Sequence, residues 1–219
     1  MYTLSFDFLR QYYPMLLQGA GVTLLLTVCS LALGFLLGII VAIMRRSSSK
    51  IFRAIGAVWV EVLRNTPFLV QLFFFYYGLP ELGINTNPIL TGIIALSVNI
   101  SAANCEVIRS GLMAVKNGYY ECAYALGYSK FQTLRYFILP ISLRIAFRPL
   151  TNNFINLVLN SSATFSITIV ELMGSAKIIS AYTSRPFEIY IIILVGYCIF
   201  TFVLSFISKY VDKRIAINL

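Results

Sequence analysis

Long apolar segments, separated by short polar ones, run along almost the whole chain. A helix that crosses a membrane needs about 20 mostly apolar residues, and five segments are that long: 16–44, 56–77, 88–113, 139–159 and 189–207. The first segment is longer than one crossing requires, so we expect it to be tilted or to extend beyond the bilayer. This pattern predicts an all-α integral membrane protein in which residues 1–219 form a single domain with five transmembrane helices.

The composition supports a membrane protein and argues against a soluble one. Of the 219 residues, 59% are apolar and only 11% are charged, whereas soluble domains carry about 25% charged residues. Residues 11–44 contain no charged side chain. That stretch is much longer than the apolar core of a signal peptide, which has about 7–15 residues, so we expect a spanning helix there.

The residue types present limit the chemistry that this chain can perform. Histidine is absent, and the four cysteines (Cys29, Cys105, Cys122 and Cys198) have no metal-ligand spacing. We therefore expect no metal site, and we interpret the cysteines as small packing residues in preference to disulfides or metal ligands. The net charge of +9 comes from basic residues in short loops between apolar segments, which indicates membrane topology and not a nucleic-acid surface.

The basic residues are distributed unequally between the two ends of the predicted helices. By the positive-inside rule, loops rich in lysine and arginine lie in the cytoplasm. The N-terminus would then lie outside and the C-terminus inside, which requires an odd number of crossings and fits five. One side carries Arg45, Arg46, Lys50, Arg53, Lys116, Lys130, Arg135, Lys209, Lys213 and Arg214, and the other carries Arg10, Lys177 and Arg185.

Two pairs of opposite charges lie inside apolar segments, where a charge costs several kcal/mol and marks a function or a partner. Glu61 and Arg64 are three residues apart in the second segment, and Glu106 and Arg109 have the same spacing in the third. That spacing places each pair on one helix face, so we favour intramembrane ion pairs for Glu61 and Glu106. For Arg64, a bidentate contact with the carboxylate of a substrate is an alternative.

Uncharged polar residues form stripes on the same segments. Gln71 follows Arg64 by seven residues, and Asn99 precedes Glu106 by seven. In the fourth segment Asn152, Asn156 and Asn160 recur at four-residue spacing and are followed by Ser161 and Ser162. Amides that face lipid would be left unpaired, so this row must face other helices or a wet cavity. For Asn160–Ser162, hydrogen bonding between helices and the lining of a substrate path remain equally open.

Small residues and prolines mark points where helices approach one another or bend. Gly34 and Gly38 form a GxxxG pair in the first segment, which we interpret as a close helix contact in preference to a role specific to transport. Pro67 and Pro149 lie within or near predicted spans, where each can kink a helix and free a carbonyl group.

The segment between the third and fourth spans, residues 116–136, is much more polar. Its sequence is KNGYYECAYALGYSKFQTLRY, and its apolar residues at 122, 123, 126, 131 and 134 approximate one face of a short helix. Gly127 would end or turn that helix. The segment lies on the basic side, so we predict an exposed cytoplasmic helix. It could lie on the lipid surface or serve as a docking surface for a soluble partner.

The same segment carries a recognisable motif. Glu121-Cys122-Ala123 is followed after three residues by Gly127, and after nine more by Phe137-Ile138-Leu139-Pro140. This spacing closely resembles the EAA loop of ABC importer permeases. The resemblance implies a type I ABC importer permease fold in which this loop is a coupling helix that seats in a groove of an ATPase subunit. Its coupling residues would be Glu121, Ala123, Leu126, Gly127 and Pro140.

Other motifs resemble the polar amino-acid branch of these permeases, the histidine, glutamine and arginine type. They are Gly21–Leu24, Arg64–Phe74, Gly78–Pro80, Phe154–Leu157 and Arg185–Tyr190. The resemblance implies a permease dimer, from the same or a different chain, in a bacterial inner membrane and fed by an extracytoplasmic binding protein. The candidate substrate path then comprises Arg64, Thr66, Gln71, Asn99, Asn156, Asn160, Ser161 and Ser162.

One stretch departs from that pattern. Where many of these permeases have a lysine followed by an acid or amide, this chain has Leu159-Asn160-Ser161-Ser162-Ala163. Without an acidic side chain, a cationic cargo such as lysine or arginine loses a possible partner.

The energy source must lie on another chain, because no glycine-rich phosphate loop with its lysine and Ser/Thr is present. We expect no cofactor on this chain, no enzymatic activity, and ATP with magnesium on the partner ATPase. The open alternatives are an ABC permease for another small polar solute, a secondary transporter, a channel or a structural subunit. A secondary transporter would show unpaired carboxylates in mid-membrane, and a channel would conduct without nucleotide.

Overall fold

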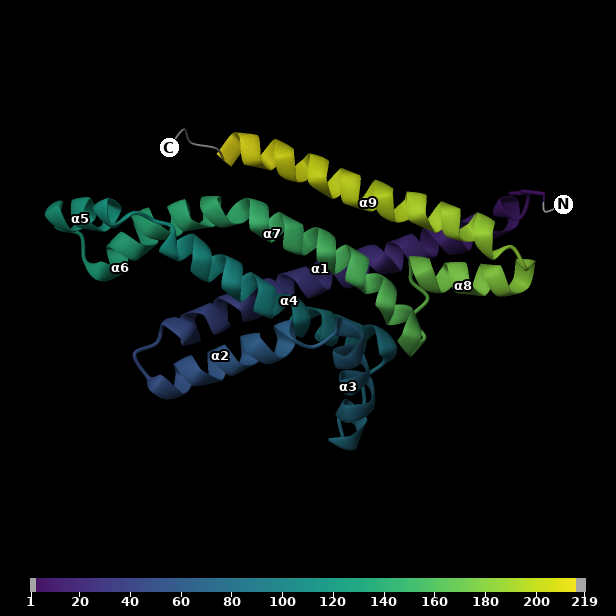
Figure 1. Ribbon diagram of the computed structural model, residues 1–219, viewed down its shortest axis with the longest axis horizontal. Coiled ribbons are helices and arrows are strands. Elements are labelled where there is room, and N and C mark those ends of the chain that lie inside the picture. Colours follow the sequence, from purple (N-terminus) through teal and green to yellow (C-terminus); the bar gives the residue numbers. More distant parts are fainter. Residues whose placement is uncertain (1–2, 216–219) are drawn as a thin grey trace.

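The structure is a computed structural model that describes residues 3–215, and within that range it contains helices and no strands. Figure 1 shows the long helices running along one axis, with the short helices α5 and α6 at one end of the bundle. The elements are α1 (Leu9–Arg46), α2 (Lys50–Arg64), α3 (Phe68–Glu81), α4 (Pro88–Met113), α5 (Asn117–Ala125), α6 (Lys130–Thr133), a π-helical turn (Leu134–Ile138), α7 (Leu139–Ser161), a 3-10 turn (Ser162–Ile167), α8 (Leu172–Thr183) and α9 (Pro186–Ile215).

Not every predicted span is a single helix. Of residues 3–215, three helices are long and apolar enough to cross a membrane: α1, α4 and α9. The count rises to four if residues 130–167 and α8, which meet at a bend of 49°, form one broken span. The α4 helix has the same bounds as the expected third span, whereas the count of five crossings stays a prediction.

The second predicted span, residues 56–77, is wrong as a continuous helix. The chain breaks between α2 and α3 at Asn65–Pro67. Pro67 has no backbone N–H and excludes helical geometry from the residue before it, and the Asn65 amide turns back to the Glu61 carbonyl at 2.8 Å. With 15 residues, α2 is about 22 Å long and is shorter than the hydrocarbon core of about 30 Å.

A close helix contact joins α1 to α4 through the GxxxG pair. A Cβ atom added at Gly34 would lie 2.1 Å from Ile100 Cγ2 and 2.9 Å from the Ser97 carbonyl oxygen. At Gly38 it would lie 2.9 Å from Asn104 Cβ. The absence of a side chain at these two positions lets the backbones approach, which is how small residues hold membrane helices together.

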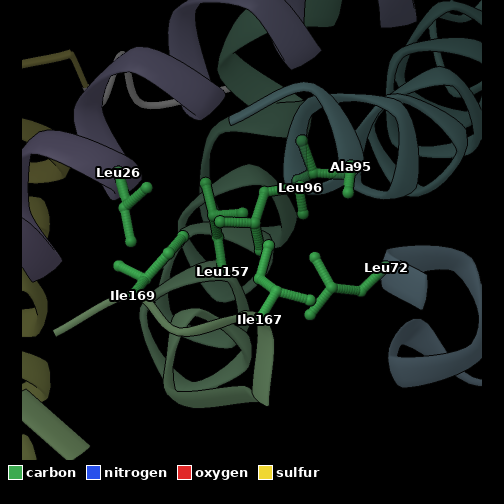
Figure 2. Close-up of a cluster of buried hydrophobic side chains, with 8 residues drawn as sticks. Leu26, Leu72, Ala95, Leu96, Leu157, Ile167 and Ile169 are labelled. Atoms are coloured by element: carbon green, nitrogen blue, oxygen red, sulfur yellow. The ribbon is translucent and has the colours of Figure 1, made fainter. Parts of the chain in front are cut away.

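The largest apolar cluster lies where α1, α3, α4 and the end of α7 meet. Figure 2 shows its side chains pointing toward one another from these separate elements. Leu26, Leu72 and Leu96 are fully buried there. Because lipid is as apolar as leucine, close packing holds these helices together and the exclusion of water contributes little. The cluster also contains Ala95, Ile100, Leu157, Ile167 and Ile169.

The fourth predicted span, residues 139–159, begins where α7 begins but does not end in a simple loop. After Ser161 the α-helix changes to a 3-10 turn, and Thr168 then adopts a left-handed conformation with φ of 69°. The helix resumes at Leu172, with the Glu171 side chain capping its first turn. Irregular backbone at this depth is tolerated only where protein surrounds it, and here Thr164, Ile167 and Ile169 are buried.

Candidate coupling segment and substrate path

The segment α5–α6 protrudes at one end of the bundle (Figure 1). The α5 helix ends in a Schellman motif, in which Tyr128 N donates to the Ala123 carbonyl at 3.1 Å and Gly127 N to the Tyr124 carbonyl at 2.9 Å. Gly127 has a φ of +83°, and no atom lies within 4 Å of where its Cβ would be. A glycine is therefore required by the backbone conformation and not by lack of space.

After this turn, α6 starts with a capping box. Ser129 Oγ accepts from Gln132 N at 3.3 Å, and Ser129 N donates to Gln132 Oε1 at 2.9 Å. The helix then passes through a π-helical turn into α7, where Pro140 occupies the first turn. Proline is accepted there because its missing N–H has no helical partner in any case. The Gly127 turn and the start of α6 are thus each held by hydrogen bonds between residues close in sequence.

The outer surface of the segment combines exposed charge with exposed apolar side chains. Leu126 is 72% exposed and Phe131 is 68% exposed, whereas Ala123 is 1% exposed. The apolar residues expected on one face are therefore not buried together, because Ala123 alone among them is buried, whereas Cys122, Leu126, Phe131 and Leu134 are exposed. Glu121 is also exposed. An isolated chain leaves this surface uncovered, which is typical of an interaction site.

Three candidate substrate residues form one hydrogen-bonded group at the break between α2 and α3. Gln71 Nε2 donates to Thr66 Oγ1 at 2.7 Å and to the Leu63 carbonyl at 2.8 Å. Asn99 Nδ2, from α4, donates to Gln71 Oε1 at 3.0 Å. These bonds use carbonyl and hydroxyl groups that the helix break would otherwise leave unpaired, so the group stabilises the interruption.

Arg64 lies at the end of α2, exposed, beside the start of α3. The N-cap of α3 is Pro67, which makes no side-chain capping bond. The first N–H groups of a helix attract anions, and α3 begins four residues after Arg64. A guanidinium group and a helix start therefore lie close together along the chain.

The remaining candidate residues lie at the end of α7 and do not share one environment. Asn156 is exposed and Asn160 is half-buried, whereas Ser161 is buried. The Ser161 and Ser162 hydroxyls each bond back to a carbonyl three residues earlier, at 2.7 and 2.6 Å. Ser162 also lines a groove of about 510 Å³ between α7 and α9, together with Tyr190 and Tyr197.

The charged pairs differ from one another. Glu106 pairs with Arg109 at 2.9 Å on its own helix and also with Arg45 at the end of α1, a second partner that the sequence did not indicate. The predicted pair of Glu61 and Arg64 is not formed in the part of the chain that the structure describes. Instead Asn65 Nδ2 donates to the Glu61 carboxylate at 3.0 Å, because the end of α2 brings this amide closer.

A buried carboxylate that the sequence analysis missed lies at the second helix interruption. Glu171 accepts from Gly174 N at 2.7 Å, Met173 N at 2.9 Å and the Tyr197 hydroxyl at 2.8 Å. Thr23, from α1, donates to it at 3.4 Å. The carboxylate therefore occupies the anion-attracting end of α8. The signal available in the sequence was a single carboxylate within an apolar stretch, where a charge marks a function or a partner.

Within residues 3–215, no group of three or more histidine, cysteine or acidic side chains could hold a metal ion. The arrangement as a whole has the exposed segment α5–α6 at one end and hydrogen-bonded helix breaks within the bundle. Such breaks are typical of transport proteins.

The chain is similar over almost its whole length to known transport proteins. Residues 34–217 match the model of the family described as binding-protein-dependent transport system inner membrane component. A probable glutamine ABC transporter permease of Bacillus subtilis is 36% identical over 203 residues, covering 93% of this chain and 94% of that protein. An L-cystine transport system permease of the same organism is 33% identical, covering 97% of this chain and 92% of that protein.

A solved structure has the same fold. It is described as the crystal structure of an amino acid ABC transporter with histidines, and one of its chains superposes with a TM-score of 0.91 at 35% sequence identity. The superposition covers 97% of this chain and 100% of that chain. The interruptions between α2 and α3 and between α7 and α8 therefore belong to a fold already seen in an amino acid transporter.

Proposed function

The chain belongs to the family of binding-protein-dependent transport system inner membrane components and has the type I ABC importer permease fold, and from this premise we propose that it is a pore-forming subunit that imports a polar amino acid. A separate ATPase drives it, and an extracytoplasmic binding protein delivers the cargo. The observation that supports this proposal is the α5–α6 segment, which combines the Glu121–Gly127 sequence with an exposed surface and a glycine-dependent turn. Such a segment would suit docking to an ATPase.

Coupling follows from how that segment is attached. It is joined to α4 at Met113 and to α7 through the π-helical turn, so a displacement of α5 acts on two membrane helices at once. The closing of the ATPase subunits on ATP would move Glu121 and Gly127 together with the ends of α4 and α7. Leu126 and Phe131 supply the exposed apolar contacts, and Pro140 fixes the start of α7. The magnesium and nucleotide remain on the ATPase.

The cargo is proposed to be an amino acid with an uncharged polar side chain. Two relatives carry the names of glutamine and cystine permeases, and residues 159–163 lack an acid that would pair with a cationic side chain. Arg64 and the start of α3 would receive the cargo's carboxylate. Thr66, Gln71 and Asn99 hold that helix end in place, and Asn156, Asn160, Ser161 and Ser162 would border the path on α7.

The membrane orientation is part of the same proposal. Five crossings arise if α2 with α3 forms one interrupted span and α7 with α8 forms another, which makes residues 1–219 one membrane domain. The start of α1 and the end of α9 lie at opposite ends of the bundle (Figure 1), in keeping with an odd number. The arginines at the end of α1 lie at the same end as α5, so this end is assigned to the cytoplasm and the N-terminus to the outside.

The test is purification of the tagged chain in mild detergent, followed by mass spectrometry of the chains that accompany it. An ATPase subunit and either a second permease or a second copy are expected. The complex is then placed in vesicles with the binding protein, and uptake of labelled glutamine, cystine and arginine is measured with and without internal ATP. Uptake of an uncharged amino acid that requires ATP supports the proposal. Uptake by the isolated chain without nucleotide would replace it with a channel.

A further inference from the structure

A basic pocket of about 420 Å³ lies at the end of the bundle where α1 and α4 end and α5 begins. Arg45 and Arg46 enter it from α1, and Arg109 enters it from α4. Asn117 and Tyr120, from α5, form its opposite side. No residue of the proposed substrate path lines this pocket, so it requires a separate explanation.

The pocket has more positive charge than its own side chains neutralise. Arg45 and Arg109 both pair with Glu106, and Arg46 lies beside them. One carboxylate therefore balances one of three guanidinium groups, and two positive charges remain. Each guanidinium group has five N–H donors. Arg109 Nη1 donates one hydrogen bond to Met113 Sδ at 3.1 Å, and a thioether sulfur is a weak acceptor. The pocket thus offers donors in excess of acceptors.

The shape of those donors selects an anion with several oxygen atoms. Arginine forks match phosphate in two parallel hydrogen bonds, and Asn117 and the Tyr120 hydroxyl add polar groups of the right size. The wall beside the arginines is apolar, formed by Leu112, Val115 and Met113, and Met113 is 71% exposed. A free inorganic anion gains nothing from such a wall, whereas the glycerol and acyl chains of a lipid would cover it.

The position in the bundle gives the same answer. Both α1 and α4 are long and apolar enough to cross the membrane, so their shared end lies at a lipid–water boundary. Basic pockets between membrane helices on the cytoplasmic side bind anionic headgroups. We propose that this pocket binds the phosphodiester headgroup of an anionic phospholipid, with Arg46 and Arg109 on the phosphate and Met113 against the acyl chain.

Such a lipid would connect the membrane to the base of α5. The headgroup would touch Arg109 on α4 and both Asn117 and Tyr120 on α5, so it would bridge the junction between the two helices. This inference goes beyond the proposed function and does not depend on the identity of the cargo. It assigns a role to Arg46 in addition to that of setting topology.

The experiment measures lipid binding by the purified transporter complex directly. The complex is titrated in detergent with phosphatidylglycerol, with phosphatidylcholine and with inorganic phosphate, and is followed by native mass spectrometry and by its thermal midpoint. Retained phosphatidylglycerol and a raised midpoint are expected, with little effect of phosphatidylcholine. In Arg46→Gln, retained phosphatidylglycerol should fall at least about fivefold, a difference equivalent to about 1 kcal/mol.

The matched control is Arg53→Gln, which removes the same charge from the start of α2, outside the pocket. Arg46→Gln leaves both partners of Glu106 in place, so the fold is retained, and the variant Arg109→Gln provides a second test on the α4 side. Equal losses of bound phosphatidylglycerol in Arg46→Gln and Arg53→Gln would overturn the proposed site and indicate a general attraction of anionic lipid to the basic surface. Equal stabilisation by inorganic phosphate would overturn the lipid assignment.

Discussion

Asn99 on α4 donates a hydrogen bond of 3.0 Å to Gln71 on α3, and this bond ties an interrupted helix to an uninterrupted one. The amide of Gln71 at the same time bonds to the end of α2 and to Thr66. A break in a membrane helix leaves backbone groups without partners, and each would cost several kcal/mol in lipid. The Gln71 side chain therefore stabilises the break between α2 and α3 by pairing polar groups that the break exposes.

The first prediction concerns Gln71→Leu. The change leaves the Asn99 amide without its acceptor, and it leaves the Leu63 carbonyl and the Thr66 hydroxyl without their donor. We therefore expect the unfolding free energy to fall by about 1–3 kcal/mol. Thermal unfolding of the purified complex measures this. In a double-mutant cycle with Asn99→Leu, the coupling should be about 1 kcal/mol, within the range for residues in contact. The exposed Gln11→Leu is the control, and an equal loss there would refute a specific role.

The second prediction tests the contact between α1 and α4. Gly34→Ala places a Cβ atom 2.9 Å from the backbone oxygen of Ser97, which cannot move without shifting α4, so a loss of about 1–3 kcal/mol is expected. Gly21→Ala, on the same helix, meets no atom within 4 Å and should be neutral or slightly stabilising, because alanine favours helices. Thermal midpoints of the two variants decide the matter. Similar midpoints would show that the helices do not pack as described.

The sequence predicts a structural feature best where the residues that determine it are close together in the chain. The bounds of α4 follow from Asn87, which caps Leu90 N at 2.8 Å, and from Pro88 in the first turn, and both signals are adjacent in sequence. At Pro67 the sequence predicted a kink, whereas the structure has a complete break between α2 and α3. The hydropathy pattern does not show this break, because it averages a single proline over a long apolar stretch.

The candidate site shows the same division. The Gly127 turn depends on residues within one helical turn. The sequence therefore predicted correctly that Gly127 ends the helix, and its positive φ agrees with that prediction. Glu171 was not anticipated, because Thr23 lies 148 residues away from it and Tyr197 lies 26 residues away. Only the folded bundle brings these hydroxyl groups to the carboxylate. The second partner of Glu106 was missed for the same reason, since Arg45 is 61 residues away.

The third prediction concerns that buried carboxylate. Glu171→Ala leaves Gly174 N, Met173 N and the Tyr197 hydroxyl without an acceptor, and it removes the cap of α8, so a loss of at least about 2 kcal/mol is expected. Tyr197→Phe removes a single bond and should cost about 1 kcal/mol. Tyr190→Phe, at an exposed position on the same helix, should have no effect. A loss in Tyr190→Phe as large as in Tyr197→Phe would contradict the network.

The fourth prediction addresses orientation through the cysteines. Cys122 lies exposed on α5, and Cys105 is buried in α4. In a variant that keeps only Cys122, a membrane-impermeant maleimide should label inside-out vesicles and leave intact cells unlabelled. A variant that keeps only Cys105 should resist the reagent in both. Labelling of Cys122 from outside the cell would place α5 on the wrong side for an ATPase and would remove the basis of the proposed function.

The last prediction separates the shape of the coupling segment from its composition. Gly127 and Gly118 both lie in this segment, and neither would place a Cβ atom within 4 Å of a neighbour. They differ in conformation, because only Gly127 has a positive φ. A valine at 127 must strain the left-handed turn or abandon it, at a cost of about 1–3 kcal/mol, whereas a valine at 118 meets no such barrier.

We therefore expect Gly127→Val to insert into the membrane at normal levels and to lose ATP-dependent uptake by at least about tenfold, while Gly118→Val retains most of it. The α5–α6 segment packs mainly on itself and on the π-helical turn before α7, so a local change there should leave the bundle intact. Membrane yield and thermal midpoint check the fold, and uptake in vesicles checks coupling. Should both variants transport equally, the Schellman turn would be a detail of the loop, and contact with the ATPase would have to reside in the flanking residues Glu121 and Phe131.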